Sequence, residues 1–189
     1  MTYLMRINRK EFLLEVSKLV WAVWTSISFI GPGFLIPNSE KRDQENKMSQ
    51  KIKFLHDWIA NLIKNMERHL NEKQRTKLLE ECGRACAKRH AQKEALKFKG
   101  DLDGWLGTMK KWVGTDNVQR DMSYVRVMYS KCFCPLVQDA PPLMSETYCN
   151  CSRGWLREVF ETVMEKPIEV KLEDSIMKGG KQCRFTISL

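Results

Sequence analysis

The chain of 189 residues lacks most of the motifs by which enzymes are recognised. It contains no GxSxG, HExxH, P-loop or dinucleotide-binding glycine pattern. It has only three histidines, His56, His69 and His90, all in its first half. The sequence therefore gives no motif support for a nucleophile-elbow hydrolase, a zinc protease or a nucleotide-dependent enzyme. A catalytic cysteine–histidine pair would require a histidine-bearing helix, such as the one with His90, to pack against a cysteine couplet. Nothing in the local sequence supports such a contact.

The chain also lacks a run of basic residues interleaved with aromatics, although its net charge is +9. Its 32 lysines and arginines are spread over many segments, so we expect no nucleic-acid partner. Solvated helix faces account best for the charge, with an anionic membrane or an acidic ligand as alternatives. A chain of this length can bury a core without metal or disulfide support.

Residues 1–39 have the composition of a signal-like or membrane-anchor segment. A basic start is followed by an uncharged stretch at 19–36, close to the roughly 20 residues that a membrane span needs. The sequence Asn8-Arg9-Lys10-Glu11-Phe12-Leu13 resembles the twin-arginine export signal, with lysine in place of the second arginine. This resemblance implies a bacterial protein that is periplasmic or anchored in a membrane. Residues 19–36 would then be the membrane tether. The alternative is a buried core helix containing Trp21 and Trp24, in a cytoplasmic protein.

Residues 40–189 are predicted to form a single α+β domain with a helical half at 40–114. After a polar linker at 39–46, apolar residues recur every three or four positions and predict an amphipathic helix. Its stripe consists of Met48, Ile52, Leu55, Ile59, Leu62, Met66 and Leu70. Asn71 with Gln74 is expected to cap a helix over 72–97. Its inner face would include Leu78, Cys82, Ala85 or Cys86, and Arg89 or His90. A shorter helix follows over 102–113.

The second half, 122–189, is predicted to be richer in strands. Residues 123–130 are mostly β-branched or aromatic and predict a strand, and 155–164 have helical periodicity. Apolar residues alternate over 168–176 and again over 183–189, with Gly179-Gly180 between them, which predicts a β-hairpin. We therefore expect N-terminal helices packed on a small antiparallel sheet that ends in this hairpin. Cys183 is in phase with the buried face and is expected to be a core residue.

Six of the seven cysteines fall in three close couplets: Cys82 and Cys86, Cys132 and Cys134, and Cys149 and Cys151. The first couplet is spaced by one helical turn, and the other two are spaced so that an extended chain directs both sulfurs to one side. Four such sulfurs can bind one tetrahedral zinc ion, so the sequence predicts a metal site, with zinc preferred and an iron–sulfur cluster second. Which four residues bind stays open. His90, among basic residues, is expected to be solvent-exposed.

Two other roles for the cysteines remain open. In an oxidising periplasm the couplets could be joined by structural disulfides, and a bridge between neighbouring couplets is less strained than one within a CxC pair. Alternatively, Cys149 or Cys151 at a helix start could be a low-pKa nucleophile of a hydrolase or redox enzyme.

The C-terminal half also resembles a known family of domains. The residues that carry this resemblance are Lys131-Cys132-Phe133-Cys134-Pro135-Leu136, Tyr148-Cys149-Asn150-Cys151-Ser152-Arg153-Gly154-Trp155, and the Gly179-Gly180 hairpin. They resemble the small-molecule-binding domain named after 4-vinyl reductase and the 2-amino-thiazoline-4-carboxylate hydrolase-like proteins. The resemblance implies an α+β fold with a ligand cavity and metal-binding cysteines, and a binding or redox-sensing module rather than a defined enzyme.

Overall fold

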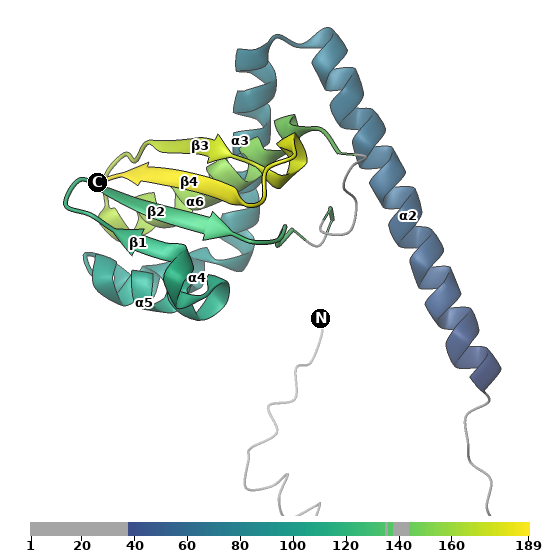
Figure 1. The fold of residues 1–189 in the computed structure, drawn as a ribbon, viewed down its shortest axis with the longest axis horizontal. Coiled ribbons are helices and arrows are strands. Elements are labelled where there is room, and N and C mark those ends of the chain that lie inside the picture. The colour runs from purple at the N-terminus through teal and green to yellow at the C-terminus, as the bar shows by residue number, and fades with distance from the viewer. Residues whose placement is uncertain (1–37, 135, 138–143) are drawn as a thin grey trace, which may run out of the picture. The chain divides into compact units, whose positions relative to one another are not determined.

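The computed structural model describes residues 38–134, 136–137 and 144–189 (Figure 1). The chain divides into two units, Met1–Glu45 and Asn46–Leu189, and the fold described below is that of the second unit. The export-like segment, its twin-arginine-like sequence and the uncharged stretch at 19–36 lie outside the described residues. None of the described helices is long and apolar enough to cross a membrane.

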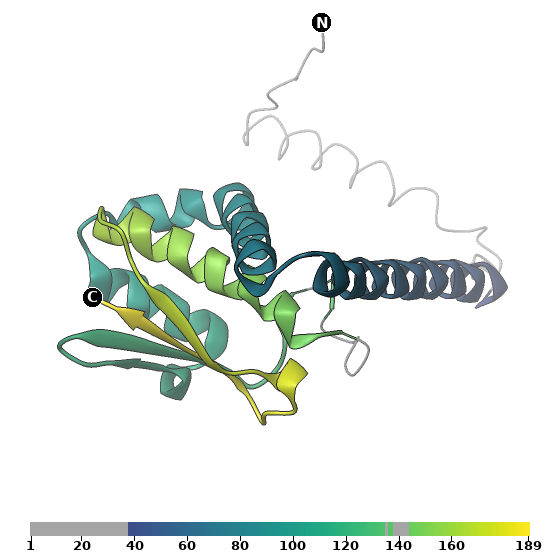
Figure 2. The same cartoon turned by 90° about the horizontal axis from the view of Figure 1, so that it is seen from above.

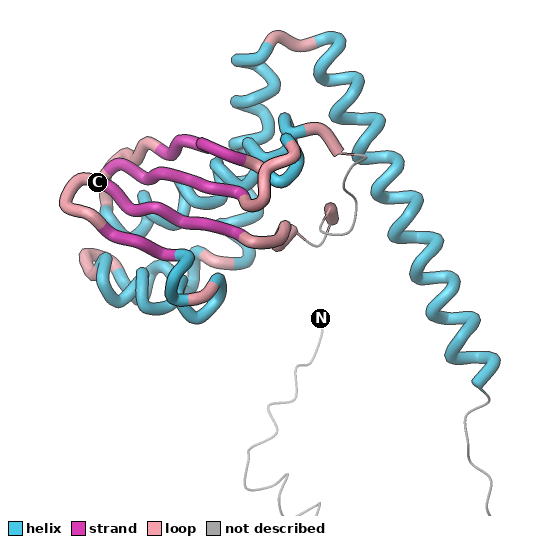
Figure 3. Tube along the Cα trace, viewed as in Figure 1, coloured by secondary structure: helices cyan, strands magenta, loops and turns pink. Residues whose placement is uncertain are grey.

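The second unit contains a four-stranded antiparallel sheet in the order β1-β2-β4-β3 (Figure 3). The strands are β1 (Val118–Arg120), β2 (Tyr124–Tyr129), β3 (Val170–Asp174) and β4 (Cys183–Ser188). Val127 pairs with Phe185 in the two central strands, and both side chains are fully buried. The alternation along β4 buries Cys183, Phe185 and Ile187, which confirms the predicted hairpin and its buried face.

The described helices are α2 (Asn38–His69), α3 (Glu72–His90), α4 (Gln92–Ala95), α5 (Leu102–Val113) and α6 (Asn150–Met164). Helices α3 to α6 form the other layer of the α+β fold that the sequence predicted, and α2 projects from it (Figure 1). Figure 2 shows α6 between α3 and the sheet. The predicted capping box at the start of α3 is present, since the Asn71 side chain accepts from the Gln74 amide at 3.0 Å.

Two apolar clusters hold these elements together. The larger one joins the sheet to α5 and α6, with Trp105, Phe160 and Phe185 as its largest fully buried side chains. A smaller cluster joins the end of α2 to α3 and to the segments around the last two cysteine couplets. It consists of Ile63, Met66, Leu79, Val137, Met144 and Tyr148. Because Cys132 and Cys134 pack against this smaller cluster, it fixes the position of their segment.

Several local predictions were wrong. The expected linker at 39–46 is helical, because α2 already begins at Asn38. The helix expected over 72–97 ends at His90 and is followed by α4 and by a 3₁₀ turn at Leu96–Phe98. The sequence also gave no sign of β1, because three residues with one apolar side chain are too short to show a period.

The inner face of α3 is the most important correction. The structure buries Leu79, Gly83 and Ala87, whereas Leu78 and both cysteines of the helix are exposed. The face is rotated by one residue from the predicted one, because the small residues Gly83 and Ala87 pack against α6. Hydrophobic periodicity gave little weight to a glycine, so it selected the wrong neighbours.

Candidate functional site

The fold brings cysteines from all three predicted couplets to one end of the sheet. Cys82 and Cys86 lie in α3, Cys132 and Cys134 follow β2, and Cys151 lies in the first turn of α6. Cys149 ends the 3₁₀ turn Glu146–Cys149 just before that helix. The seventh cysteine, Cys183, opens β4 and pairs with Tyr129 at the end of β2. Each cysteine has at least one other cysteine nearby.

A very close crossing of α3 and α6 determines where the cysteines of these two helices lie. A Cβ atom built on Gly83 would lie 1.9 Å from the carbonyl oxygen of Cys151, and one built on Gly154 would lie 2.1 Å from the carbonyl oxygen of Glu80. Only glycine lets the two backbones approach so closely. Because Cys82 adjoins Gly83, the crossing brings the α3 couplet beside Cys151.

An ion pair between Glu80 and Arg153 spans the same crossing. Further along, Arg84 Nη2 lies 3.0 Å from Glu158 and 2.6 Å from Glu161. Glu158 is only 5% exposed, so its charge needs this partner. The close glycine contact is thus accompanied by a row of ion pairs between α3 and α6, which we call the charged seam. Together they hold α3 in register against α6.

The remaining couplet reaches the crossing from the segment after β2. Cys134 Sγ lies 3.3 Å from the hydroxyl oxygen of Tyr148, which is largely buried in the smaller apolar cluster. Burial, the hydrogen bond with Cys134 and the nearby sulfurs all raise the pKa of Tyr148. Tyr148 therefore stays a neutral hydroxyl that positions Cys134.

Five sulfurs from three segments form what we call the outer thiol group. Its members are Cys82, Cys86, Cys132, Cys134 and Cys151. Burial, with a smaller contribution from the other four sulfurs, raises the pKa of Cys151 to about 12. Desolvation and Cys134 raise the pKa of Cys86, although Arg89 opposes them. Because the pKa values of Cys86, Cys132 and Cys151 are raised, ionisation of each of these three thiols is disfavoured.

Cys149 and Cys183 form an inner thiol pair, which lies near Cys132 of the outer thiol group. They are 6% and 7% exposed, and Cys149 Sγ lies 3.0 Å from the Ser175 hydroxyl oxygen. The backbone N–H of Ile176 donates to Cys183 Sγ at 3.5 Å. A hydrogen bond with Cys149 lowers the pKa of Cys183 to about 7, and the same bond together with burial raises the pKa of Cys149. The prediction that Cys183 is a core residue is confirmed, and its contact with Cys149 is additional.

A small cavity of about 40 Å³ lies between the two sets of sulfurs. It is lined by Tyr129, Cys132, Phe133, Cys134, Tyr148, Cys149, Ser152, Ile176, Met177 and Cys183. A space of this size holds a water molecule or an ion, whereas an organic ligand needs several hundred Å³.

The described residues contain no group of three or more His, Cys, Asp or Glu side chains whose arrangement could hold a metal ion. The sulfurs of the outer thiol group are thus close together without converging on one point. All seven cysteines, each within the described ranges, are free thiols. His90 is exposed at the end of α3, as expected.

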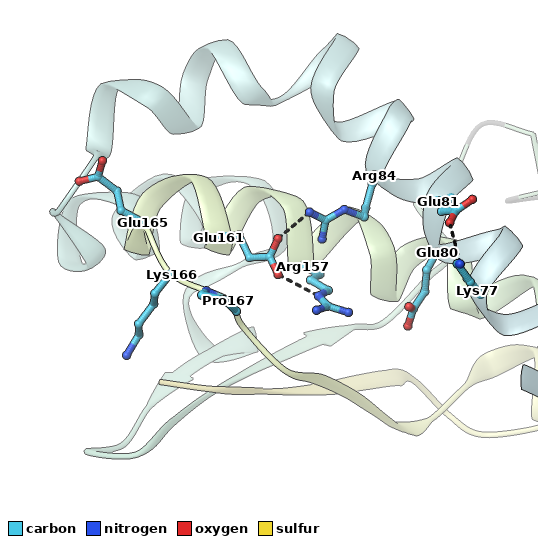
Figure 4. Close-up of a pocket in the computed structure, with 9 residues that line it drawn as sticks. All are labelled: Lys77, Glu80, Glu81, Arg84, Arg157, Glu161, Glu165, Lys166 and Pro167. Carbon is cyan, nitrogen blue, oxygen red and sulfur yellow. Dashed lines mark hydrogen bonds and ion pairs between the residues drawn. The ribbon is translucent and has the colours of Figure 1, made fainter.

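A second, larger hollow is lined in part by charged residues of α3 and α6 and is open to solvent (Figure 4). Its volume is about 620 Å³, and it is lined by Lys77, Glu80, Glu81, Arg84, Arg157, Glu161, Glu165, Lys166 and Pro167. Burial would raise the pKa of Glu161, but hydrogen bonds from Arg84 and Arg157 outweigh it and lower this pKa. We call this hollow the charged groove.

The sequence reasoning assigned no role to Gly83 or Ser175, and it named Gly154 and Tyr148 only as part of the family resemblance. The two glycines could have been noticed in the sequence. Glycine destabilises a helix interior, so its presence close to a cysteine couplet in each helix indicates a close packing contact. The contacts of Tyr148 with Cys134 and of Ser175 with Cys149 could not be predicted, because they depend on how distant segments meet.

A sequence comparison then identifies the family. The profile of a family of unknown function, DUF6144, matches residues 40–189. The chain belongs to this family. The match covers all the cysteines, the glycine crossing and the whole sheet of this DUF6144 protein. Comparison with curated proteins gives no match.

Proposed function

We propose that this DUF6144 protein binds a metal ion through its outer thiol group. The observation that carries the proposal is the gathering of five sulfurs from three separate segments around the crossing of α3 and α6. Thiolates are the ligands that zinc and iron–sulfur clusters prefer. Zinc is our first choice, since four sulfurs complete its tetrahedral shell, and an iron–sulfur cluster is the second.

Within the group, Cys134 and Cys151 are the best-supported ligands. Cys151 is near all four other members, and Cys134 is near Cys86, Cys132 and Cys151. Cys86 and either Cys82 or Cys132 would complete four ligands after small side-chain movements. Cys149, from the predicted set of six, faces Cys183 instead and is assigned to the inner thiol pair.

We further propose that the metal supports small-molecule binding or redox sensing. The cavity of about 40 Å³ between the sulfurs suits an ion and is too small for an organic ligand. The charged groove, at about 620 Å³, is the better place for a small polar molecule. The helix crossing would couple the metal at the outer thiol group to a molecule in the charged groove, because Glu80 belongs to both the crossing and the groove.

The alternative of a cysteine nucleophile loses support at the expected positions. The pKa values of Cys149 and Cys151 are both raised, whereas a nucleophilic cysteine needs a lowered one. Disulfide bridging remains the other alternative, and it predicts few free thiols in the purified protein.

The test is elemental analysis of the purified full chain together with a count of its free thiols. We expect about one zinc or a stoichiometric amount of iron, and loss of that metal in Cys134→Ser and Cys151→Ser. Cys183→Ser, outside the outer thiol group, is the matched control and should keep the metal. A metal-free protein with only about one free thiol would overturn the proposal in favour of disulfides.

We also propose that the protein is exported or tethered to a membrane by its first 39 residues. The support is the basic start, the uncharged stretch at 19–36 and the twin-arginine-like sequence. A reporter fused after residue 39 should leave the cytoplasm in a bacterial host. Retention of the reporter in the cytoplasm would contradict this part of the proposal.

A further inference from the structure

Helix α2 exposes a continuous set of large apolar side chains that its own domain does not cover. We call this set the α2 apolar face: Met48, Ile52, Phe54, Leu55, Trp58 and Leu62. Their exposed fractions run from 43% for Ile52 and Leu62 to 67% for Phe54. Soluble domains rarely leave so many large apolar residues together at the surface without a binding role.

The predicted apolar stripe of α2 was correct only in part. Near the end of the helix, Met66 is buried in the smaller apolar cluster as predicted, but Ile63 is buried there in place of Leu62, which is exposed. Over 48–62, the described residues of the domain leave most of the stripe exposed. The exposed part of α2 continues directly into the part that is buried against the domain. A partner that binds the exposed part would therefore lie next to the domain.

We propose that the α2 apolar face binds the surface of an anionic lipid bilayer. This inference is independent of the outer thiol group and of any tether formed by 19–36. It requires only that α2 lies in the interface with its apolar side chains between the lipid chains and its lysines at the phosphates.

The charges of this part of α2 favour an anionic surface. Residues 46–64 contain four lysines and a single acid, Asp57. Lys47 precedes Phe54 by seven residues, and Lys51 precedes Trp58 by seven. Each lysine therefore lies on the same side of the helix as its aromatic residue, two turns earlier, and its long side chain can extend toward the phosphates. An aromatic residue at the boundary with lysines beside it is typical of helices that lie on membranes.

A second copy of the chain is the other possible occupant. Ile52 and Ile59 alternate with Leu55 and Leu62 in a heptad pattern that suits a two-stranded coiled coil. The flanking positions do not support it, however. They hold Lys51 and Trp58 on one side and His56 and Ile63 on the other, so no acid would face Lys51. His56 and Ile63 are moreover already buried, at 8% and 2% exposure.

Hydrogen–deuterium exchange of the full chain tests the proposal, because it reports on α2 separately from any tether. Peptides covering 47–62 are followed without vesicles, with phosphatidylcholine vesicles, and with vesicles containing one part phosphatidylglycerol to two parts phosphatidylcholine. We expect slower exchange in these peptides with the anionic vesicles and little change with the neutral ones.

Two variants locate the contact. Lys47→Gln/Lys51→Gln should raise the half-saturating concentration of anionic lipid roughly twenty-five-fold, since each lysine near such a surface contributes about fivefold in affinity. Leu55→Gln/Trp58→Gln should abolish the protection. Met122→Gln is the matched control, because Met122 is an apolar side chain 97% exposed outside α2, and it should change nothing.

The other outcomes overturn the proposal. Unchanged exchange in 47–62 with anionic vesicles means that the face does not bind lipid. Equal protection of 47–62 from exchange by neutral and anionic vesicles would mean that the lysines do not select an anionic surface. Protection without vesicles that grows with protein concentration identifies a second copy as the occupant, and protection that is independent of concentration identifies a cover within the chain.

Discussion

The backbone of Gly83 lies directly against the carbonyl oxygen of Cys151, at a distance that leaves no room for a Cβ atom. This contact joins the helix that carries the first cysteine couplet to the start of the helix that carries the last. The outer thiol group therefore depends on a glycine as much as on the cysteines. The contact also makes the site part of the helix packing, so that stability and thiol geometry should change together.

Replacement of Gly83 by alanine should separate α3 from α6. The added methyl group would meet backbone atoms, which cannot move aside as a side chain can, so we expect a loss of about 3 kcal/mol in the free energy of unfolding. Gly107→Ala is the matched control, because Gly107 is an exposed helix glycine with nothing within 4 Å of an added Cβ. It should gain about 0.5–1 kcal/mol in urea denaturation. Equal effects of the two changes would contradict the close crossing.

Removal of the Arg84 guanidinium should leave Glu158 with weak partners. Glu158 is 5% exposed, and its other cation, Lys88, is 3.8 Å away. Arg84→Met should therefore cost about 3 kcal/mol in the free energy of unfolding, because a buried charge loses its partner. The exposed pair Lys77–Glu81 is the control, and Lys77→Met should cost less than about 0.5 kcal/mol. A similar small cost at both positions would show that Arg84 is not needed to compensate Glu158.

Glu67 should make stability depend on acid pH. Hydrogen bonds from Ser145 and from Thr147, the latter at 2.6 Å, lower the pKa of its carboxyl group. A lowered folded-state pKa contributes stability above the unfolded-state pKa, and this stability is lost as the pH falls through the folded-state value. Wild type should therefore have a higher melting temperature than Glu67→Gln at pH 7, and the gap should narrow below about pH 4. A gap of constant size between pH 7 and pH 3 would argue against these hydrogen bonds.

The thiols should differ in their accessibility to an alkylating reagent. Cys82 and Cys86 are exposed, whereas Cys149 and Cys183 are buried. In the metal-free protein, mass spectrometry should find iodoacetamide first on the two α3 cysteines and last on the inner thiol pair. One thiol outside α3 that reacted far faster than all the others would instead support the nucleophile alternative.

The sequence predicted those elements whose residues contact their near neighbours in the chain. The 168–189 hairpin and α5 follow from local alternation and from helical spacing, and both were confirmed. The face of α3 was wrong because its packing depends on Gly83 and Ala87, whose small size carries no hydrophobic signal. The meeting of Cys149 with Cys183 could not be predicted, because it depends on the strand order that places β4 beside β2.

X-ray absorption at the metal edge of the purified full chain tests the central claim most directly. If the outer thiol group binds zinc, the first coordination shell should contain four sulfurs at about 2.3 Å, and Cys151→Ser should remove or alter that shell. A shell made only of nitrogen and oxygen, or an unchanged sulfur shell in Cys151→Ser, would contradict metal binding by the cysteines at the crossing of α3 and α6.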